Sequence, residues 1–128
     1  MWKLLVSLII SLVLSVSTAF ASTLDEKPST LSENQCMSYG MTAANISIVE
    51  SQGASLSDIL ILLDNPGFKT NPEDIQQLII VTAMYLTSVG KGQTPEQNVQ
   101  GATDFCMAAK GDVEKMIKAI QELLGTPI

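Results

Sequence analysis

Apolar and small residues follow a helical spacing through the first long segment of this chain, residues 33–51. They recur every three or four positions, in a stripe of Cys36, Tyr39, Gly40, Ala43, Ile46 and Val49. Ser32, with Gln35 three residues later, forms the capping box that typically opens such a helix, and Gly53 follows its end. The pattern predicts a first helix whose small residues would let a second helix approach closely.

Similar signals predict four more helices. An Asp-Asn-Pro-Gly turn at 64–67 separates the second from the third. The second segment is apolar enough to be a strand, but its capping residues and leucine content favour a helix. The four are expected near 56–63, 72–89, 95–109 and 113–124, after the capping residues Ser55, Asn71, Thr94 and Asp112. We therefore predict an all-α fold, a single compact bundle of about five short helices.

Residues 1–21 have the pattern of a cleavable secretory signal peptide. Lys3 precedes an apolar stretch, and small residues precede the expected cleavage site between Ala21 and Ser22. The alternative is a transmembrane anchor, but the stretch of about 13 residues is shorter than the roughly 20 that span a bilayer. We predict a periplasmic or secreted protein with no stable membrane anchor after cleavage. Residues 22–31 would be a flexible lead-in, and 32–128 the helical domain.

The charge of the chain narrows the possible partners. The sequence has seven lysines, no arginine and thirteen acidic residues, for a net charge of −6. Cleavage would remove Lys3 and make the balance still more acidic. Nucleic-acid recognition uses basic patches and arginine, so the sequence argues against a nucleic-acid partner, and against anionic membrane surfaces. The acidity is explained by solubility alone, but it would also suit a basic protein partner.

Two cysteines, Cys36 and Cys106, lie 70 residues apart in the expected exported domain. An even number of cysteines in an exported chain predicts a disulfide, which would join the first and fourth helices. The alternative, a reactive thiol, lacks both a Cys-x-x-Cys motif and a histidine that could activate a thiolate.

Catalytic and cofactor motifs are missing from the sequence. Without histidine, the usual triads and zinc motifs cannot be built. Gly90-Lys91-Gly92 lacks the spacing of a phosphate-binding loop, and the acid pairs Asp25-Glu26 and Glu73-Asp74 are explained by solvation or helix capping. We therefore expect a protein that is not an enzyme and uses no cofactor or metal. The five methionines after the leader are expected to fill gaps in the core, with an adaptable binding surface as the alternative.

Several of these features recur in a known family. Cys36, Tyr39-Gly40, the apolar run into Tyr85-Leu86, Thr94-Pro95, Ala102 and Phe105-Cys106 together resemble small exported immunity proteins of type VI secretion amidase effectors. The same outline is similar to periplasmic acid-stress chaperones with one disulfide across a helical core. The first resemblance implies inhibition of a protein partner, and the second implies protection of unfolded clients.

The sequence thus favours a non-enzymatic exported binding protein that inhibits or shields a protein partner. The alternative is an acid-stress or holdase chaperone. The acids at helix starts, Glu73, Asp74 and Glu96, are the candidate partner-facing residues, although capping also explains them. The sequence leaves the oligomeric state open.

Overall fold

The computed structural model describes residues 29–125, which fold into six helices. The predicted signal peptide and its expected cleavage site between Ala21 and Ser22 lie outside the described residues. The helices are α2 (Glu33–Ser51), α3 (Leu56–Leu63), α4 (Pro66–Lys69), α5 (Glu73–Leu86), α6 (Pro95–Ala108) and α7 (Val113–Leu124). The predicted all-α bundle is confirmed, with one helix more than the five expected.

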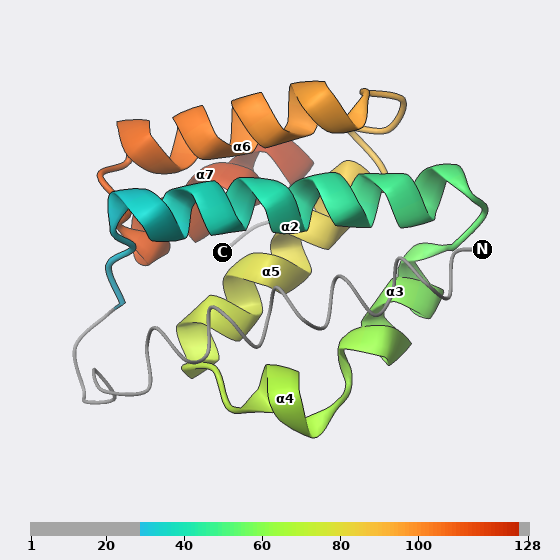
Figure 1. Ribbon diagram of the computed structural model, residues 1–128, viewed down its shortest axis with the longest axis horizontal. Coiled ribbons are helices and arrows are strands. Elements are labelled where there is room, and N and C mark those ends of the chain that lie inside the picture. Colours follow the sequence, from blue (N-terminus) through green and yellow to red (C-terminus); the bar gives the residue numbers. More distant parts are fainter. Residues whose placement is uncertain (1–28, 126–128) are drawn as a thin grey trace.

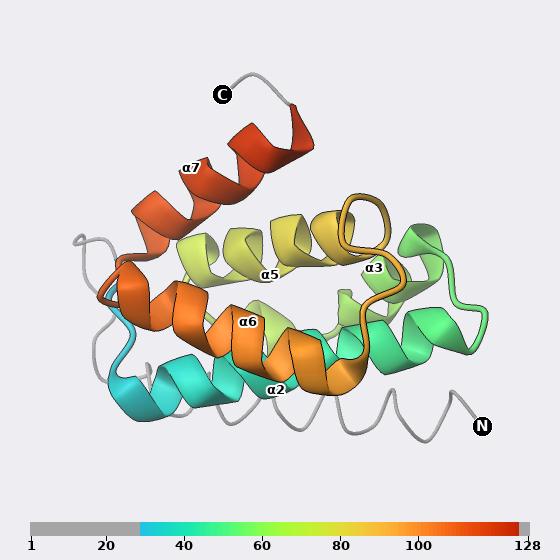
Figure 2. The same cartoon turned by 90° about the horizontal axis from the view of Figure 1, so that it is seen from above.

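Helices α2 and α6 run antiparallel, side by side, and form the most extensive helix contact in the described part of the chain (Figure 1). Helix α5 lies between α2 and α7 when the molecule is seen from above (Figure 2). It contacts both of these helices, and α7 more extensively. The fold is therefore arranged around α5, which packs against α2 on one side and α7 on the other, while α6 packs along α2.

Capping boxes explain where three of the helices begin. Ser32 and Gln35 form the predicted capping box at α2: the Ser32 amide donates to the Gln35 side chain at 2.6 Å, and the Gln35 amide donates back at 3.3 Å. Ser55 opens α3 and Thr94 opens α6 in the same way. These pairs satisfy backbone donors that the first helical turn leaves without partners.

The segment between α3 and α5 differs from the prediction. Residues 64–67 were expected to form a turn, but Asn65 caps the additional short helix α4, accepting a 2.9 Å hydrogen bond from the Phe68 amide. The buried Phe68 ring anchors this helix in the core. Asn71, the predicted cap of the next helix, is itself buried and donates to the Phe68 carbonyl at 2.8 Å. Helix α5 therefore begins after Pro72, without a side-chain cap.

The end of the predicted lead-in belongs to the folded domain. The Leu31 amide donates to the Gly111 carbonyl at 2.8 Å, and Thr30 forms an isolated antiparallel bridge with Asp112. The Leu31 side chain is buried in the core. Residues 29–31 are therefore held as an extended strip against the turn that joins α6 to α7, which corrects the prediction that they are flexible.

The core is apolar and draws on every helix. Its largest fully buried apolar side chains are Ile46 and Val49 of α2, Ile59 of α3, Ile75 and Leu78 of α5, and Val113 and Met116 of α7. The predicted inner stripes of α2 and α7 lie within this core, as helical periodicity requires. In the described residues, no helix is both long enough and apolar enough to cross a membrane.

Candidate interaction surface

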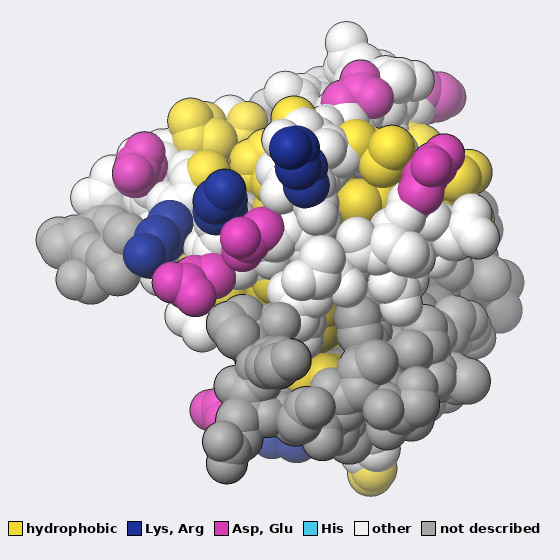
Figure 3. All heavy atoms as spheres, turned by 90° about the vertical axis from the view of Figure 1, so that its left-hand side faces the viewer, with side chains coloured by type: hydrophobic (Ala, Val, Ile, Leu, Met, Phe, Trp, Pro, Cys, Tyr) yellow, Lys and Arg dark blue, Asp and Glu magenta, His cyan; other side chains and the backbone are white. Residues whose placement is uncertain are grey.

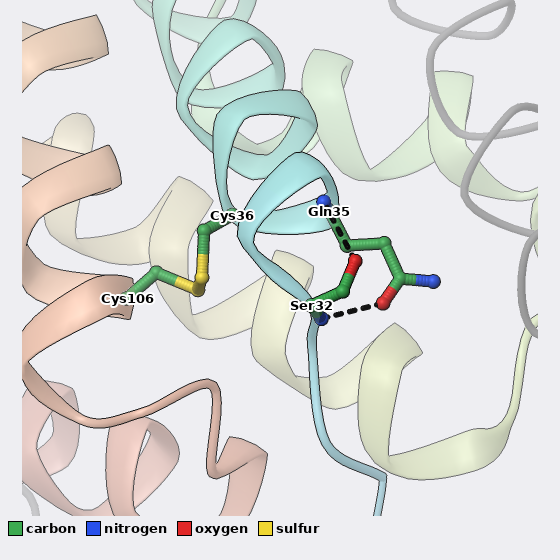
Figure 4. The surroundings of a disulfide bond; sticks show 4 residues. All are labelled: Ser32, Gln35, Cys36 and Cys106. Atoms are coloured by element: carbon green, nitrogen blue, oxygen red, sulfur yellow. Dashed lines mark hydrogen bonds between the residues drawn. A yellow bond between two sulfur atoms is a disulfide. The ribbon is translucent and has the colours of Figure 1, made fainter.

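The predicted disulfide is formed between Cys36 and Cys106, with an S–S distance of 2.05 Å. It ties the first turn of α2 to the last turn of α6 (Figure 4). Both cysteines are fully buried, and their Cα atoms are 5.4 Å apart. In this oxidised state neither sulfur is a thiol nucleophile, so the bridge is structural in the fold described here.

A glycine brings the same two helices together one turn further along α2. A Cβ atom built on Gly40 would lie 2.8 Å from the Val99 carbonyl oxygen and would collide with the Thr103 side chain. Real Cβ contacts are not this short, so only glycine fits at this position. The close approach predicted from the small residues of the first helix is therefore found at Gly40, and α6 is the helix that approaches.

Three methionines on α2 and α6 are exposed, contrary to the expectation that methionines fill the core. The exposed fractions are 54% for Met37, 50% for Met41 and 42% for Met107. Met84 is half-buried, and only Met116 is fully buried. The prediction of core methionines is therefore wrong for three of the five, because packing of α2 against α6 leaves these positions outside the core.

The exposed methionines share one side of the helix pair. Met37 follows Cys36, and Met107 follows Cys106. Each step turns about 100° around its own helix axis, and because the two helices are antiparallel, both steps lead to the same side of the pair. Met41 lies one turn beyond Met37 on α2. We call Met37, Met41, Met107 and the partly exposed Val99 the methionine surface. Figure 3 faces the disulfide end and shows hydrophobic side chains at the surface, with both acidic side chains and lysines beside them.

The charged side chains on the two helices that carry the methionine surface are all acidic. Helices α2 and α6 contain four carboxylates and no lysine. Glu50 is paired with Lys91 at 3.6 Å, but the exposed Glu33, Glu96 and Asp104 form no ion pair in residues 29–125. Lys110 lies just beyond the end of α6. The pair of helices thus presents exposed methionines in a mainly negative setting.

The three acids predicted to face a partner are not brought together. Asp74 is half-buried and accepts hydrogen bonds from the Ser29 amide at 2.7 Å and from the Ser29 hydroxyl at 2.9 Å. It therefore holds the start of the domain in place. Glu73 and Glu96 are exposed, but the helix starts that carry them lie at opposite ends of the molecule (Figure 1). Of the three, Glu96 is on the same helix pair as the methionine surface.

The described residues contain one strongly perturbed titratable group. Burial raises the pKa of Tyr39 to about 12, and a hydrogen bond with Thr82 opposes part of this effect. The 2.7 Å bond joins the two hydroxyl groups across the α2–α5 contact. Tyr39 therefore stays protonated at ordinary pH. Within residues 29–125, no cluster of three or more acidic or cysteine side chains could hold a metal ion.

Comparison with known proteins gives no match: no protein-family model, no curated protein and no solved structure is similar to this chain.

Proposed function

We propose that this chain is an exported, non-enzymatic protein that binds a protein partner and thereby inhibits or shields it. The observation that carries the proposal is the methionine surface, where three exposed methionines gather on one side of the helix pair α2 and α6. Scattered exposed apolar residues are normal on soluble proteins. A group of them on one helix pair, held rigid by a buried disulfide, is a feature of interaction sites.

Methionine suits such a surface for a physical reason. Its side chain is unbranched and polarisable, so it adapts to the shape of a partner and still removes apolar area from water. The disulfide beside Met37 and Met107 fixes the backbone from which both side chains project. A rigid backbone with adaptable side chains reduces the entropy lost on binding.

The charge around the surface supports a basic partner. Glu33, Glu96 and Asp104 would attract positive charge and steer it toward the methionines. Complementary charge mainly raises the association rate and excludes partners of the same sign. The buried Cys36–Cys106 bridge supports the exported location, because disulfides persist in oxidising compartments.

A pair of variants tests the proposal directly. The double variant Met37→Ser/Met107→Ser removes two exposed apolar side chains, and Ile61→Ser removes another of similar exposure from α3. Wild-type protein and both variants are immobilised and exposed to the periplasmic or secreted fraction of the source cells. We expect one protein to bind the wild type and Ile61→Ser in a near 1:1 ratio. Its affinity for the double variant should fall roughly tenfold or more.

The salt dependence of that complex provides a second readout. Raising the salt concentration to about 0.5 M should slow association more than it speeds dissociation, because exposed charges are screened. The proposal fails if no protein needs the methionines for binding. It also fails if the surface only joins two copies of this chain, seen as a concentration-dependent dimer that the double variant loses. Suppressed aggregation of many unrelated proteins at low pH would instead establish the chaperone alternative.

A further inference from the structure

The methionine surface also gathers the side chains of this fold that react most readily with an oxidant. A methionine thioether uses an electron pair on sulfur to take an oxygen atom from a peroxide, and the product is a polar sulfoxide. The oxidant has to reach the sulfur atom. The exposed fraction of each methionine therefore decides which of them react while the protein is folded.

The methionines of the described residues differ sharply in exposure. Met37, Met41 and Met107 expose between 42% and 54% of their surface. Met84 is half-buried, and Met116 is 0% exposed in the core. A peroxide can therefore reach three sulfur atoms on the outer side of α2 and α6, whereas the sulfur of Met116 becomes accessible only when the protein opens.

Few other groups in residues 29–125 can compete for a peroxide. Cys36 and Cys106 are already joined in the buried disulfide, so the described residues hold no free thiol. Tyr39 is buried and Tyr85 is half-buried, and a peroxide attacks a phenol far less readily than a thioether. The chain has no histidine, and its one tryptophan, Trp2, lies outside the described residues. Oxidation of the folded domain is thus directed to the methionine surface.

The acidic surroundings favour an uncharged oxidant. Hydrogen peroxide carries no charge, so the exposed Glu33, Glu96 and Asp104 do not repel it as they would repel an anion. The same carboxylates have no proton to donate to a sulfoxide oxygen. A sulfoxide on this surface would therefore depend on water for much of its hydrogen bonding.

We propose that the methionine surface is a modification site, at which hydrogen peroxide converts three methionines to sulfoxides, leaves the fold intact and releases the protein partner. In each reaction the oxygen–oxygen bond breaks, a sulfur–oxygen bond forms, and the sulfur loses two electrons. The second oxygen of the peroxide keeps both protons and leaves as water. The release of a partner rests on the proposed function, whereas the choice of Met37, Met41 and Met107 rests on their exposure.

Oxidation acts differently on the free protein and on the complex. In the free protein the sulfoxide oxygens stay in contact with water, and changes at exposed positions scarcely alter stability. In the complex the partner would cover these oxygens, and a buried polar group without a hydrogen-bond partner is costly. The Cys36–Cys106 bridge is already oxidised, so it holds α2 and α6 together before and after the reaction.

The first experiment maps the oxidation without any partner. The exported protein is treated with hydrogen peroxide, which is then removed with catalase, and each methionine is assayed by peptide mass spectrometry. We expect one added oxygen atom on each of Met37, Met41 and Met107, slower reaction at Met84, and none at Met116 until denaturant unfolds the protein. The denaturant midpoint of the treated protein should equal that of the untreated protein.

The second experiment compares the affinity for the captured partner before and after treatment. We expect treated wild type to bind at least tenfold more weakly. In Met37→Leu/Met41→Leu/Met107→Leu the surface keeps apolar side chains of similar volume but has no thioether. Whatever the starting affinity of this variant, peroxide should leave it unchanged. Met84→Leu is the matched control, and it should lose affinity on treatment as the wild type does.

The proposal is overturned if Met84 or Met116 reacts as fast as the exposed three, or if oxidation of those three unfolds the protein. It is also overturned if treated and untreated wild type bind the partner equally, or if the leucine variant loses affinity as the wild type does. Failure of the proposed function looks different, because untreated protein then binds no partner through the methionines. The release is refuted with it, while the oxidation map still decides which methionines react.

Discussion

Helices α6 and α7 follow one another in the chain but are held to the fold in different ways. Helix α7 has 12 residues and buries four apolar side chains, Val113, Met116, Ile117 and Ile120. Helix α6 has 14 residues and buries only two side chains, the polar Asn98 and the bridged Cys106. Helix α7 is therefore held by hydrophobic burial. Helix α6 is held by the disulfide and by its close backbone approach to α2.

This difference explains where the candidate site lies. The apolar stripe of α7 is used by the core, and its outer face carries charges of both signs, including a 3.4 Å pair between Lys118 and Glu114. Helix α6 contributes little to the core, and its outer face carries Met107 of the methionine surface. A helix fixed by a covalent bond needs fewer apolar contacts with the core. More of its surface is therefore available for binding.

Removing the disulfide should cause the largest loss of stability and should affect α6 more than α7. In Cys36→Ser/Cys106→Ser we expect the free energy of unfolding to fall by about 4 kcal/mol, because a loop of 70 residues is no longer closed in the unfolded chain. Denaturant unfolding measures the loss. Hydrogen exchange should show faster opening of α6 than of α7. Equal loss of protection in both helices would contradict the view that α6 depends on the bridge.

The complementary substitution removes a buried apolar side chain from α7. Met116 is completely buried, so Met116→Ala should lower the free energy of unfolding by about 3 kcal/mol through lost burial and a new cavity. Hydrogen exchange should now show α7 opening before α6. Met107→Ala on α6 is the matched control, since that side chain is exposed, and its effect should stay within about 0.5 kcal/mol. A large effect of the control would place Met107 in the core.

Much of the fold could be predicted because its signals are local. The caps at Ser32, Ser55 and Thr94 lie within three residues of the groups they bond, and the helical stripe of α7 is a pattern of the same short range. With only two cysteines, their pairing needed no knowledge of the fold. Helix α4 was missed because the Asn-Pro-Gly sequence that signals a turn also supplies a cap and a first helical residue.

The candidate site was harder to predict because it depends on which helices meet. Exposure of Met37 and Met107 follows from the antiparallel contact of α2 with α6, which periodicity alone does not specify. One signal was present: each of these methionines follows a cysteine of the expected bridge. Asp74 was predicted to face a partner, and its bonds to Ser29 appear only when residues far apart in sequence are folded together.

A smaller loss of stability is expected from a substitution that loosens the α2–α6 contact and leaves the disulfide intact. Gly40→Ala places a methyl group where the Val99 carbonyl and the Thr103 side chain already lie. We expect a loss of about 2 kcal/mol in the free energy of unfolding, because the helices must move apart. Gly101→Ala is the control: the added methyl group would meet no other atom within 4 Å, and a helical glycine replaced by alanine should gain up to about 1 kcal/mol. Equal effects of the two changes would refute close packing at Gly40.

The smallest loss of stability at neutral pH is expected when the hydrogen bond between Tyr39 of α2 and Thr82 of α5 is removed. At alkaline pH the same substitution should instead make the protein more stable than the wild type. Tyr39→Phe removes the hydroxyl that is hydrogen-bonded to the Thr82 hydroxyl, at an expected loss of about 1 kcal/mol. Burial raises the Tyr39 pKa from 10.0 to about 12. Between these values the unfolded chain releases a proton that the folded chain keeps, so stability falls as pH rises, by up to about 3 kcal/mol. The phenylalanine variant lacks this loss, and its stability should exceed that of the wild type above pH ~11.

Thr82→Val keeps the buried phenol, so its stability should still fall at alkaline pH. Denaturant unfolding from pH 8 to 12 measures all three proteins, and parallel curves for wild type and Tyr39→Phe would show that the folded protein does not hold this proton.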